Sequence, residues 1–423
     1  MGLGNSPRVR NPMLPVLTVA GVLLVTAQMH RFGGGVIAGE LHRVFDLGAG
    51  EIGLIMGAMP LASAVVQVPV GLAFDRFGTR LTVSFLSLVA LLGTLILAFA
   101  DGAVGLALGR FLIGAGLAAV VTALLLLTMR WAPPERYASV AATVMAAASM
   151  AGGLLATVPL GFFLQRAGWT PTFLGIALLT LMVIALCFAV MRDAPPGSEA
   201  RGTRPESVAQ SLRGLFAVLA DPDVRRIMAM ATCVIAPFMC VGGLWAGPYL
   251  QVVHGLDPVE ASWVLLAMIT TANVGTFFYG PLDRRLGGRR KVVLGGAVAT
   301  MTMLAALSLW PEPGLWLAIA MLLLLAVVTP FYVTLTAHSR SFVPVERAGR
   351  VLTTINLFAL GTAFVAQWLT GLLVALPGGA GLGTEPGFRL AFGFLALMLL
   401  GAILVYRGAP ERPAATDTSE VSV

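Results

Sequence analysis

Charged residues are scarce in this sequence. They make up only 11% of the 423 residues, whereas hydrophobic residues make up 58%. Ordinary soluble domains are about 45–50% apolar, so a soluble chain of this length would leave much apolar surface uncovered. The composition therefore excludes a soluble globular protein and favours a polytopic membrane protein, whose outer surface faces lipid.

Lysine is almost absent. The single Lys291 is followed by Val292, whereas a phosphate-binding loop of the G-x-x-x-x-G-K-[ST] type requires Ser or Thr after the lysine. The chain therefore cannot carry an ATPase site of this kind.

Cysteine and histidine are also rare. Cys187, Cys233 and Cys240 all lie in apolar runs and have no paired spacing, so we interpret them as packing residues rather than as a disulfide framework. The four histidines are scattered without metal-ligand spacing, and no nucleophile–base pattern accompanies them. We therefore expect no enzyme, no metal and no cofactor.

Long apolar runs, by contrast, are abundant. A helix needs about 20 apolar residues to cross the hydrocarbon core of a bilayer. The run behind the basic N-terminus is too long for a signal-peptide core, so we interpret it as a retained first helix. The sequence predicts an all-α polytopic fold with twelve transmembrane helices at 14–38, 51–71, 80–100, 103–128, 137–164, 170–191, 227–251, 259–280, 291–310, 314–337, 350–375 and 387–406.

The connection after the sixth run is longer and more polar than the others. It is rich in Pro, Gly, Ser and charge, which indicates a surface linker with a short amphipathic helix near 207–219. This linker divides the chain into two six-helix bundles. The predicted order is a cytoplasmic tail at 1–13, a bundle at 14–191, the linker at 192–226, a second bundle at 227–406 and a cytoplasmic tail at 407–423.

The basic residues alternate between the two sides of the membrane. With both termini in the cytoplasm, 22 of the 27 Lys and Arg residues fall in cytoplasmic segments, while Arg43, Arg166 and Arg389 fall outside, and Arg31 and Arg110 lie within spans. This asymmetry is typical of the positive-inside rule. It predicts a multi-pass protein of a bacterial inner membrane with both termini cytoplasmic. It also accounts for the net charge of +7 without nucleic acid as a partner.

The two halves repeat each other. Asp75–Arg76 and Asp283–Arg284 are 208 positions apart, and Glu135–Arg136 and Glu346–Arg347 are 211 apart. Chance similarity of Arg-rich loops is the alternative explanation, but two loop pairs agree on nearly the same offset. Parallel six-helix repeats are typical of one large class of transporters, which bind substrate near the membrane midplane between the halves.

Three local patterns carry a resemblance to the major facilitator superfamily, and the resemblance extends over about residues 14–407. The stretch "GLAFDRFGTR" (71–80) resembles the family's motif in the loop between spans 2 and 3, and differs from it only at Thr79. The stretch "GRFLIGAG", with Arg110, Gly114 and Gly116, resembles its span 4 motif. The stretch "YGPLDRRLGGRRK" (279–291) resembles a degenerate second copy of the first motif.

The resemblance implies a gate that closes the cytoplasmic side in one state of the transport cycle. In that gate Asp75 faces the N-terminus of span 11, where the helix dipole stabilises an aspartate by about 0.3–1 kcal/mol, and pairs with Arg130. The pseudosymmetric latch would use Asp283 and Arg340. The alternative is that the charged residues of this motif only fix the orientation of the helices in the membrane. The candidate gating residues are Gly71, Asp75, Arg76, Gly78, Arg80, Arg130, Asp283, Arg284 and Arg340.

Two arginines lie inside predicted spans, where a charge costs about 2.5–3.5 kcal/mol on insertion scales and indicates function. The resemblance implies that Arg110, with Gly114 and Gly116, couples the helices of the bundle to the rocking motion. In the same role Arg110 would couple protonation to that motion. The alternative is a purely structural role, in which Arg110 caps carbonyl groups between spans.

Arg31 shares a helical face with Gln28 and Gly35, and its planar guanidinium suits a carboxylate or phosphate. The surrounding stretch resembles span 1 of the organophosphate and organic-anion branch of the superfamily. That branch often has a second arginine in span 7, and the corresponding "PFMCVGGLWAGPYL" has none. A monocarboxylate therefore fits better than a phosphate ester. The alternative is that Arg31 pairs with Glu40 or Glu51, or extends outward.

No Asp or Glu lies at mid-depth in the spans, so a simple carboxylate proton relay is disfavoured. The sequence predicts a secondary active transporter of a small organic solute, preferably an organic anion, with a proton as one candidate coupling ion. We expect it to act as a monomer in the bilayer. Drug or siderophore export is the alternative, and a transporter-derived sensor or scaffold ranks below it. The candidate substrate-binding residues are Arg31, Gln28, Trp245, Tyr249, Asn273, Tyr332 and Asn356.

Overall fold

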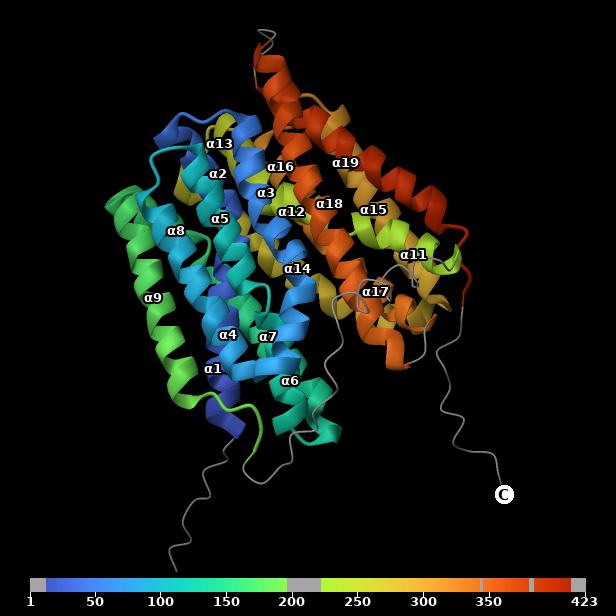
Figure 1. Ribbon diagram of the computed structural model, residues 1–423. Coiled ribbons are helices and arrows are strands. Elements are labelled where there is room, and N and C mark those ends of the chain that lie inside the picture. Colours follow the sequence, from blue (N-terminus) through green and yellow to red (C-terminus); the bar gives the residue numbers. More distant parts are fainter. Residues whose placement is uncertain (1–12, 196–221, 343–344, 380–383, 412–423) are drawn as a thin grey trace, which may run out of the picture.

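The computed structural model describes residues 13–195, 222–342, 345–379 and 384–411 (Figure 1). Every regular element in these ranges is a helix. The predicted amphipathic helix near 207–219 and most of both predicted tails lie outside the described residues.

The N-terminal half is built from helices that are interrupted at several places within a single pass. Its elements are α1 (Met13–Phe32), α2 (Gly34–Phe45), α3 (Ala49–Val65), α4 (Gln67–Phe99), α5 (Ala103–Leu117), α6 (Val120–Trp131), η1 (Pro134–Arg136), α7 (Tyr137–Leu155), α8 (Val158–Ala167) and α9 (Trp169–Val190).

The C-terminal half repeats this plan, and its first span contains a π turn, η2. Its elements are α11 (Pro222–Cys233), α12 (Ala236–Cys240), η2 (Val241–Trp245), α13 (Ala246–Val252), α14 (Pro258–Leu286), α15 (Arg289–Leu309), α16 (Leu315–Val328), η3 (Thr329–Phe331), α17 (Tyr332–Arg340), α18 (Val345–Gly379) and α19 (Glu385–Tyr406).

The number of membrane passes depends on a sharp turn within α4. In the described residues, eleven helical segments are long and apolar enough to cross a membrane, and α3 is a shorter apolar helix. The backbone of α4 leaves helical geometry at Gly78, where φ is 77°. The residues before Gly78 continue α3 and complete a second span, and those after it form a third. Counted in this way, the described residues contain twelve apolar helical segments long enough to cross a membrane, and the predicted all-α polytopic fold is confirmed.

Some predicted span ends differ from those of the structure. The first span was expected to end at residue 38, but after a short interruption at Gly33 its helix continues as α2 to Phe45. The interruption is small because the amide N–H of Gly33 still donates to Met29 O (3.0 Å) and that of Ile37 to Gly33 O (2.9 Å). Apolar composition alone does not mark this end, because the helix continues beyond the apolar run.

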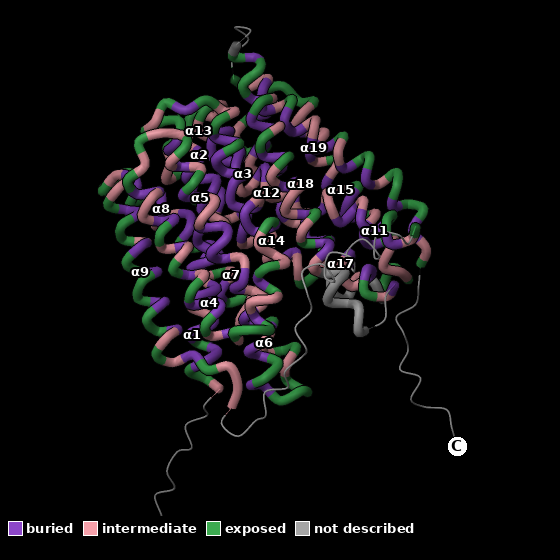
Figure 2. Tube along the Cα trace, viewed as in Figure 1, coloured by how far each residue is buried: buried purple, intermediate pink, exposed green. Residues whose placement is uncertain are grey.

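The two halves meet mainly at the side of the molecule away from the start of α1. There α3 packs against α18, α2 packs against η2 and α13, and α14 packs against α7 and α8. One buried apolar cluster contains residues of both halves, such as Leu41 of α2 and Leu250 of α13 (Figure 2). At the opposite side, α6 and α17 do not share an extensive interface within the described residues (Figure 1).

Glycines allow the backbones of the two halves to approach each other at the closed side. A Cβ on Gly34 would overlap the carbonyl oxygen of Gly243, and a Cβ on Gly247 would overlap that of Gly35. Close backbone approach of this kind is a common way for membrane helices to associate. The structure is therefore closed at the side of α2 and α13, and the halves separate toward the side where α1 begins.

Candidate functional site

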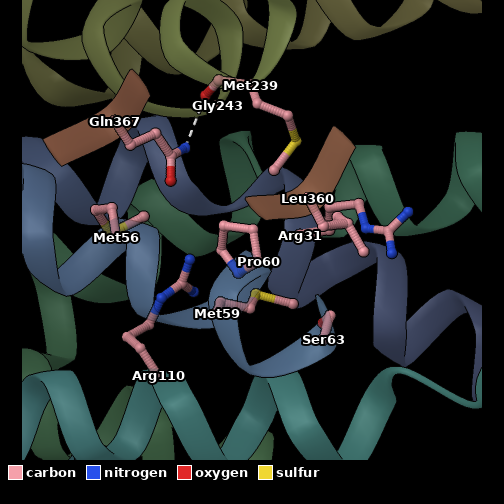
Figure 3. Close-up of a pocket in the computed structure, with 10 residues that line it drawn as sticks. All are labelled: Arg31, Met56, Met59, Pro60, Ser63, Arg110, Met239, Gly243, Leu360 and Gln367. Atoms are coloured by element: carbon pink, nitrogen blue, oxygen red, sulfur yellow. Dashed lines mark hydrogen bonds between the residues drawn. The ribbon is translucent and has the colours of Figure 1, made fainter. Parts of the chain in front are cut away.

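A pocket lies between the two halves, and both of the intramembrane arginines line it. Figure 3 shows its ten lining residues. They come from α1, α3 and α5 of the N-terminal half and from α12, η2 and α18 of the C-terminal half. The lining residues are Arg31, Met56, Met59, Pro60, Ser63, Arg110, Met239, Gly243, Leu360 and Gln367.

Arg31, near the end of α1, is half-buried. Its guanidinium lies within electrostatic range of the phenol of Tyr332, at the start of α17 in the other half. Two of the seven candidate substrate residues therefore lie near each other across the interface. Arg31 forms no ion pair with any described residue.

Neither of the acids suggested as partners for Arg31 pairs with it. The carboxylate of Glu40 accepts hydrogen bonds from Arg43 Nε (3.1 Å) and Nη2 (2.5 Å). The carboxylate of Glu51 caps the start of α3 by accepting from the amide N–H of Gly48 (3.0 Å). The alternative in which Arg31 is neutralised by Glu40 or Glu51 is therefore wrong.

Arg110, in the middle of α5, is only 3% exposed. Its Nη1 donates to the backbone oxygen of His30 at 3.3 Å, and its Nε has no hydrogen-bond partner among the described residues. The cost of an unpaired buried charge is several kcal/mol. The protein therefore holds a guanidinium at the pocket without a counterion from its own described residues.

The glycines after Arg110 explain why α5 lies so close to its neighbours. A Cβ on Gly114 would overlap the carbonyl oxygen of Met59 in α3, and one on Gly116 would overlap backbone atoms of α4. The hydroxyl of Ser63 donates to Gly114 O at 2.9 Å. Gly114 and Gly116 therefore pack span 4 against spans 2 and 3, which fixes the position of Arg110.

Three further polar candidates lie at different places in the spans. Gln28 is buried, and its Nε2 donates to Ser149 Oγ at 2.7 Å, which joins α1 to α7. The Nδ2 of Asn273 donates to Ile269 O one turn earlier in α14 (2.9 Å). Asn356 is exposed on α18. None of the three lines the pocket of Figure 3.

Trp245 and Tyr249 are core residues in this arrangement rather than cavity residues. Trp245 is 1% exposed, and its Nε1 donates to Thr370 Oγ1 at 2.8 Å. Tyr249 is 2% exposed and packs edge-on against Phe388 and His254. Burial lowers the pKa of His254, which lies in the loop after α13. The expectation that Trp245 and Tyr249 line the cavity is not met by this arrangement.

The first gating motif lies at the side where the halves are apart. Asp75 is exposed and forms no hydrogen bond or ion pair with any described residue. The guanidinium of Arg76 stacks over the Phe77 ring at 5.3 Å. A Cβ added to Gly71 would meet nothing within 4 Å. The expected pairing of Asp75 with Arg130, and any hydrogen bond from span 11 to Asp75, are absent from the described part of this arrangement.

Asp193, a residue that the sequence did not single out, anchors this motif. Its Oδ1 accepts from the amide N–H of Arg80 at 2.7 Å, and its backbone oxygen accepts from Arg130 Nη1 at 3.5 Å. Arg80 Nη2 also donates to Phe188 O at 2.5 Å. Arg80 and Arg130 therefore tie the turn at Gly78 and the end of α6 to the end of α9.

The second copy of the motif has the same kind of anchor. The carboxylate of Glu411, just beyond α19, accepts from the amide N–H of Arg290 at 3.2 Å, two residues after Gly288, where φ is 156°. The two halves share this arrangement. In each, the carboxylate of an acid that follows the last helix accepts from the amide N–H two residues after a glycine of the turn. Asp193 accepts from Arg80 after Gly78, and Glu411 accepts from Arg290 after Gly288. Arg340 is exposed, and the side chains of Asp283 and Arg284 lie outside the described residues.

Comparison with known proteins identifies the architecture. The family model described as "Major Facilitator Superfamily" matches residues 19–367 and 248–422. The chain belongs to the major facilitator superfamily. As a superfamily member it is a multi-pass membrane transporter of small organic solutes and not an enzyme.

Several curated relatives are similar to this superfamily member at about 25% identity. The gentisate transporter of Corynebacterium glutamicum is 25% identical over 380 residues, 88% of this chain and 82% of that protein. The cis,cis-muconate transport protein of Acinetobacter baylyi is 24% identical over 345 residues, 80% of this chain and 82% of that protein. The hexuronate transporter of Bacillus subtilis is 25% identical over 184 residues, and this match spans only 44% of the chain and 43% of that protein.

Solved structures share the fold at lower identity. A bacterial homologue of the human lysosomal transporter Spinster, in an inward-facing and unoccupied conformation, matches with a TM-score of 0.76 and 18% identity over 95% of this chain and 97% of that chain. A D-xylose–proton symporter matches with a TM-score of 0.71 and 15% identity over 94% of this chain and 98% of that chain. These likenesses establish the superfamily fold alone.

Proposed function

We propose that this transporter carries an organic anion and binds its carboxylate through Arg31. One observation carries the proposal: two guanidinium groups, Arg31 and Arg110, line one pocket between the halves, and no described carboxylate pairs with either. A carboxylate can accept two parallel hydrogen bonds from a guanidinium. An anionic ligand would therefore supply the charge that the described protein residues do not.

The cost of a charge within the membrane supports this interpretation. Such residues are expensive, face a cavity or a partner, and mark substrate pathways. Arg31 is the more accessible of the two arginines and lies opposite Tyr332. The printed names of the relatives, which include gentisate, muconate and hexuronate transporters, are names of organic acids. A monocarboxylate needs only one strongly binding cation, and Arg31 supplies it.

Export of cationic drugs is less well supported. Two uncompensated positive charges at the pocket would repel a cationic ligand. Siderophores and other acidic chelates would not be repelled by this site.

The transport cycle follows from the topology that we propose. With both termini in the cytoplasm, the separated side of the structure faces the cytoplasm and the glycine-packed side faces outward. Asp75 would then engage span 11 only after the halves rock and the cytoplasmic side closes. We further propose that the protein acts as a monomer, with a proton as the candidate coupling ion.

A ligand-induced thermal shift of the purified protein tests the substrate class. The panel should contain carboxylates, neutral sugars and cationic drugs at matched concentrations. We expect stabilisation by carboxylates, because a ligand that binds only the folded state stabilises it in proportion to RT ln(1 + [L]/Kd). Stabilisation by sugars or drugs but by no acid would contradict the proposal.

A further inference from the structure

Two residues that line the pocket each have a buried polar atom without a partner. The atoms are Nε of Arg110 and Oε1 of Gln367, and neither forms a hydrogen bond in the described structure. Figure 3 shows the guanidinium of Arg110 and the carbonyl oxygen of Gln367 pointing toward each other across the pocket, with no hydrogen bond between them. Buried polar groups are nearly always paired, so each exception needs an explanation.

The orientation of the Gln367 amide is fixed by its other end. Its Nε2 donates to the backbone oxygen of Met239 at 3.0 Å. A carbonyl oxygen can only accept, so the nitrogen must face Met239 and the oxygen must face the pocket. Gln367 is 2% exposed and Arg110 is 3% exposed, so neither unpaired atom is compensated by bulk water.

The two atoms belong to different halves and to opposite hydrogen-bonding classes. Arg110 lies on α5 of the N-terminal half and offers an N–H donor, whereas Gln367 lies on α18 of the C-terminal half and offers an acceptor. A hydroxyl group satisfies both atoms at once, because it has one donor proton and two acceptor lone pairs.

We propose that the substrate is a hydroxylated carboxylic acid whose hydroxyl bridges Arg110 and Gln367. This inference rests on the proposed function, in which the carboxylate binds Arg31. In Figure 3 the guanidinium of Arg31 lies to one side of the pocket and points away from Arg110 and Gln367, so the bridging hydroxyl stands at the end of the molecule away from the carboxylate. The bridge would also join the two halves when the substrate is bound.

Other ligand groups fit this pair of atoms less well. A second carboxylate would satisfy Arg110 but would place an acceptor against Oε1 of Gln367, which has no proton to donate. An unsubstituted hydrocarbon would leave both atoms unpaired. The walls can adapt to a hydroxyl-bearing ligand, because Met56, Met59 and Met239 line the pocket and methionine side chains adjust readily.

The test compares acids that differ by a hydroxyl. The Kd values of 3-hydroxybenzoate, 4-hydroxybenzoate and benzoate, and of gluconate and hexanoate, are measured by isothermal titration calorimetry on the full-length protein, with cis,cis-muconate as a dicarboxylate. We expect at least one hydroxylated acid to bind about ten- to a hundredfold more tightly than its unsubstituted counterpart, because that counterpart leaves a buried donor and acceptor unpaired.

A variant assigns the discrimination to Gln367. Gln367→Met keeps the size but removes the acceptor, so the ratio of the two Kd values should fall to nearly one. Thr300→Val is the matched control, because Thr300 is a buried polar residue of α15 whose hydroxyl donates within its own helix, to Gly296 O at 2.8 Å, and does not line the pocket. It should keep the wild-type ratio. If Gln367→Met does not fold, the wild-type ratio alone decides.

Three other results of the binding measurements would contradict different parts of the proposal. Equal binding of hydroxylated and unsubstituted acids to the wild type would overturn the hydroxyl bridge and leave the organic-anion function intact. Tighter binding of muconate than of every hydroxylated acid would contradict the hydroxyl bridge. It would indicate that a second carboxylate of the substrate binds at this position. Failure of all the acids to bind would contradict the proposed function itself.

Discussion

At the scale of single residues, the two intramembrane arginines are held in different ways. Arg110 is almost fully buried and donates to the backbone of His30. Arg31 is half-buried and lies within electrostatic range of Tyr332 of the other half. Arg31 is therefore the better placed of the two to receive a ligand that enters between the halves, and Arg110 is better placed to hold the far end of that ligand.

The Arg31 site predicts a loss of anion affinity on truncation. Leaving one charge of a buried pair unpaired costs about 3–5 kcal/mol, so Arg31→Ala should weaken binding of an anionic ligand by about two to three orders of magnitude. Arg31→Lys should recover only part of this loss, because an ammonium cannot reproduce the planar fork. Calorimetric titration of one identified ligand measures both effects, with size exclusion as a check of folding.

Arg166→Ala is the control for this experiment, because Arg166 lies over the Phe162 ring at the end of α8 and not at the pocket. It should bind the ligand like the wild type. If the ligand is an anion and both Arg31 variants also bind it like the wild type, Arg31 is a structural residue and the site assignment is wrong.

The buried position of Arg110 predicts that a change to lysine is tolerated less well there than at Arg31. A lysine cannot donate to His30 O and to a ligand hydroxyl with the geometry of the guanidinium. Arg110→Lys should therefore lose most transport while the melting temperature shows a folded protein. Near-wild-type uptake by this variant in a cell-based assay would remove Arg110 from the mechanism.

The sequence revealed the arginines because a charge within an apolar span is costly and stands out. It did not reveal that Trp245 and Tyr249 are core residues. A membrane helix is apolar toward lipid and also toward its neighbours, so periodicity does not indicate which face is buried. Asp193 was missed for another reason: it begins a polar linker, and only the folded chain brings it to the turn at Gly78.

At the scale of elements, two glycines of one motif have opposite environments. Gly78 has a φ of 77°, and a Cβ there would lie 2.5 Å from Asp193 Oδ2. Gly71 is helical, and a Cβ there would meet nothing within 4 Å. Left-handed backbone costs a residue with a side chain about 1–2 kcal/mol. Gly78→Ala should therefore lower the melting temperature of the purified protein.

Gly71→Ala is the matched comparison, and its melting temperature should equal or exceed that of the wild type. If Gly71 approaches the other half when the cytoplasmic side closes, the same variant should transport more slowly. Equal thermal stability of both variants would contradict the interpretation of Gly78 as a turn residue that must be glycine.

The predictable and unpredictable parts of the helices have a common physical origin. The thickness of the bilayer fixes the length of an apolar run, so the twelve spans could be found from composition. The interruptions at Gly33 and within η2 could not, because helix breaks in membrane spans depend on neighbouring helices that satisfy the freed backbone groups. The pocket lies beside one such interruption, at Gly243.

At the scale of the whole molecule, the separated side predicts how the gate responds to loss of its charge. Asp75 has no partner among the described residues, so Asp75→Asn should not change the free energy of this arrangement. It should remove about 0.3–1 kcal/mol from the alternative, in which the dipole of α18 attracts the carboxylate. The population should shift roughly two- to fivefold toward the present arrangement, and transport should fall without loss of expression.

Labelling of a cysteine introduced at the exposed position Asn356, in a background without Cys187, Cys233 and Cys240, reports this shift as faster modification. Asp101→Asn, an exposed acid between α4 and α5, is the control and should label like the wild type. Unchanged labelling and unchanged uptake in Asp75→Asn would contradict the latch.

The central claim is that this superfamily member moves an organic acid through a site built on Arg31. Uptake of radiolabelled hydroxylated acids into proteoliposomes, with wild type and Arg31→Ala compared at equal protein content, tests it most directly. We expect saturable uptake by the wild type that Arg31→Ala abolishes. Saturable uptake of a neutral or cationic solute, with no uptake of any acid, would contradict it.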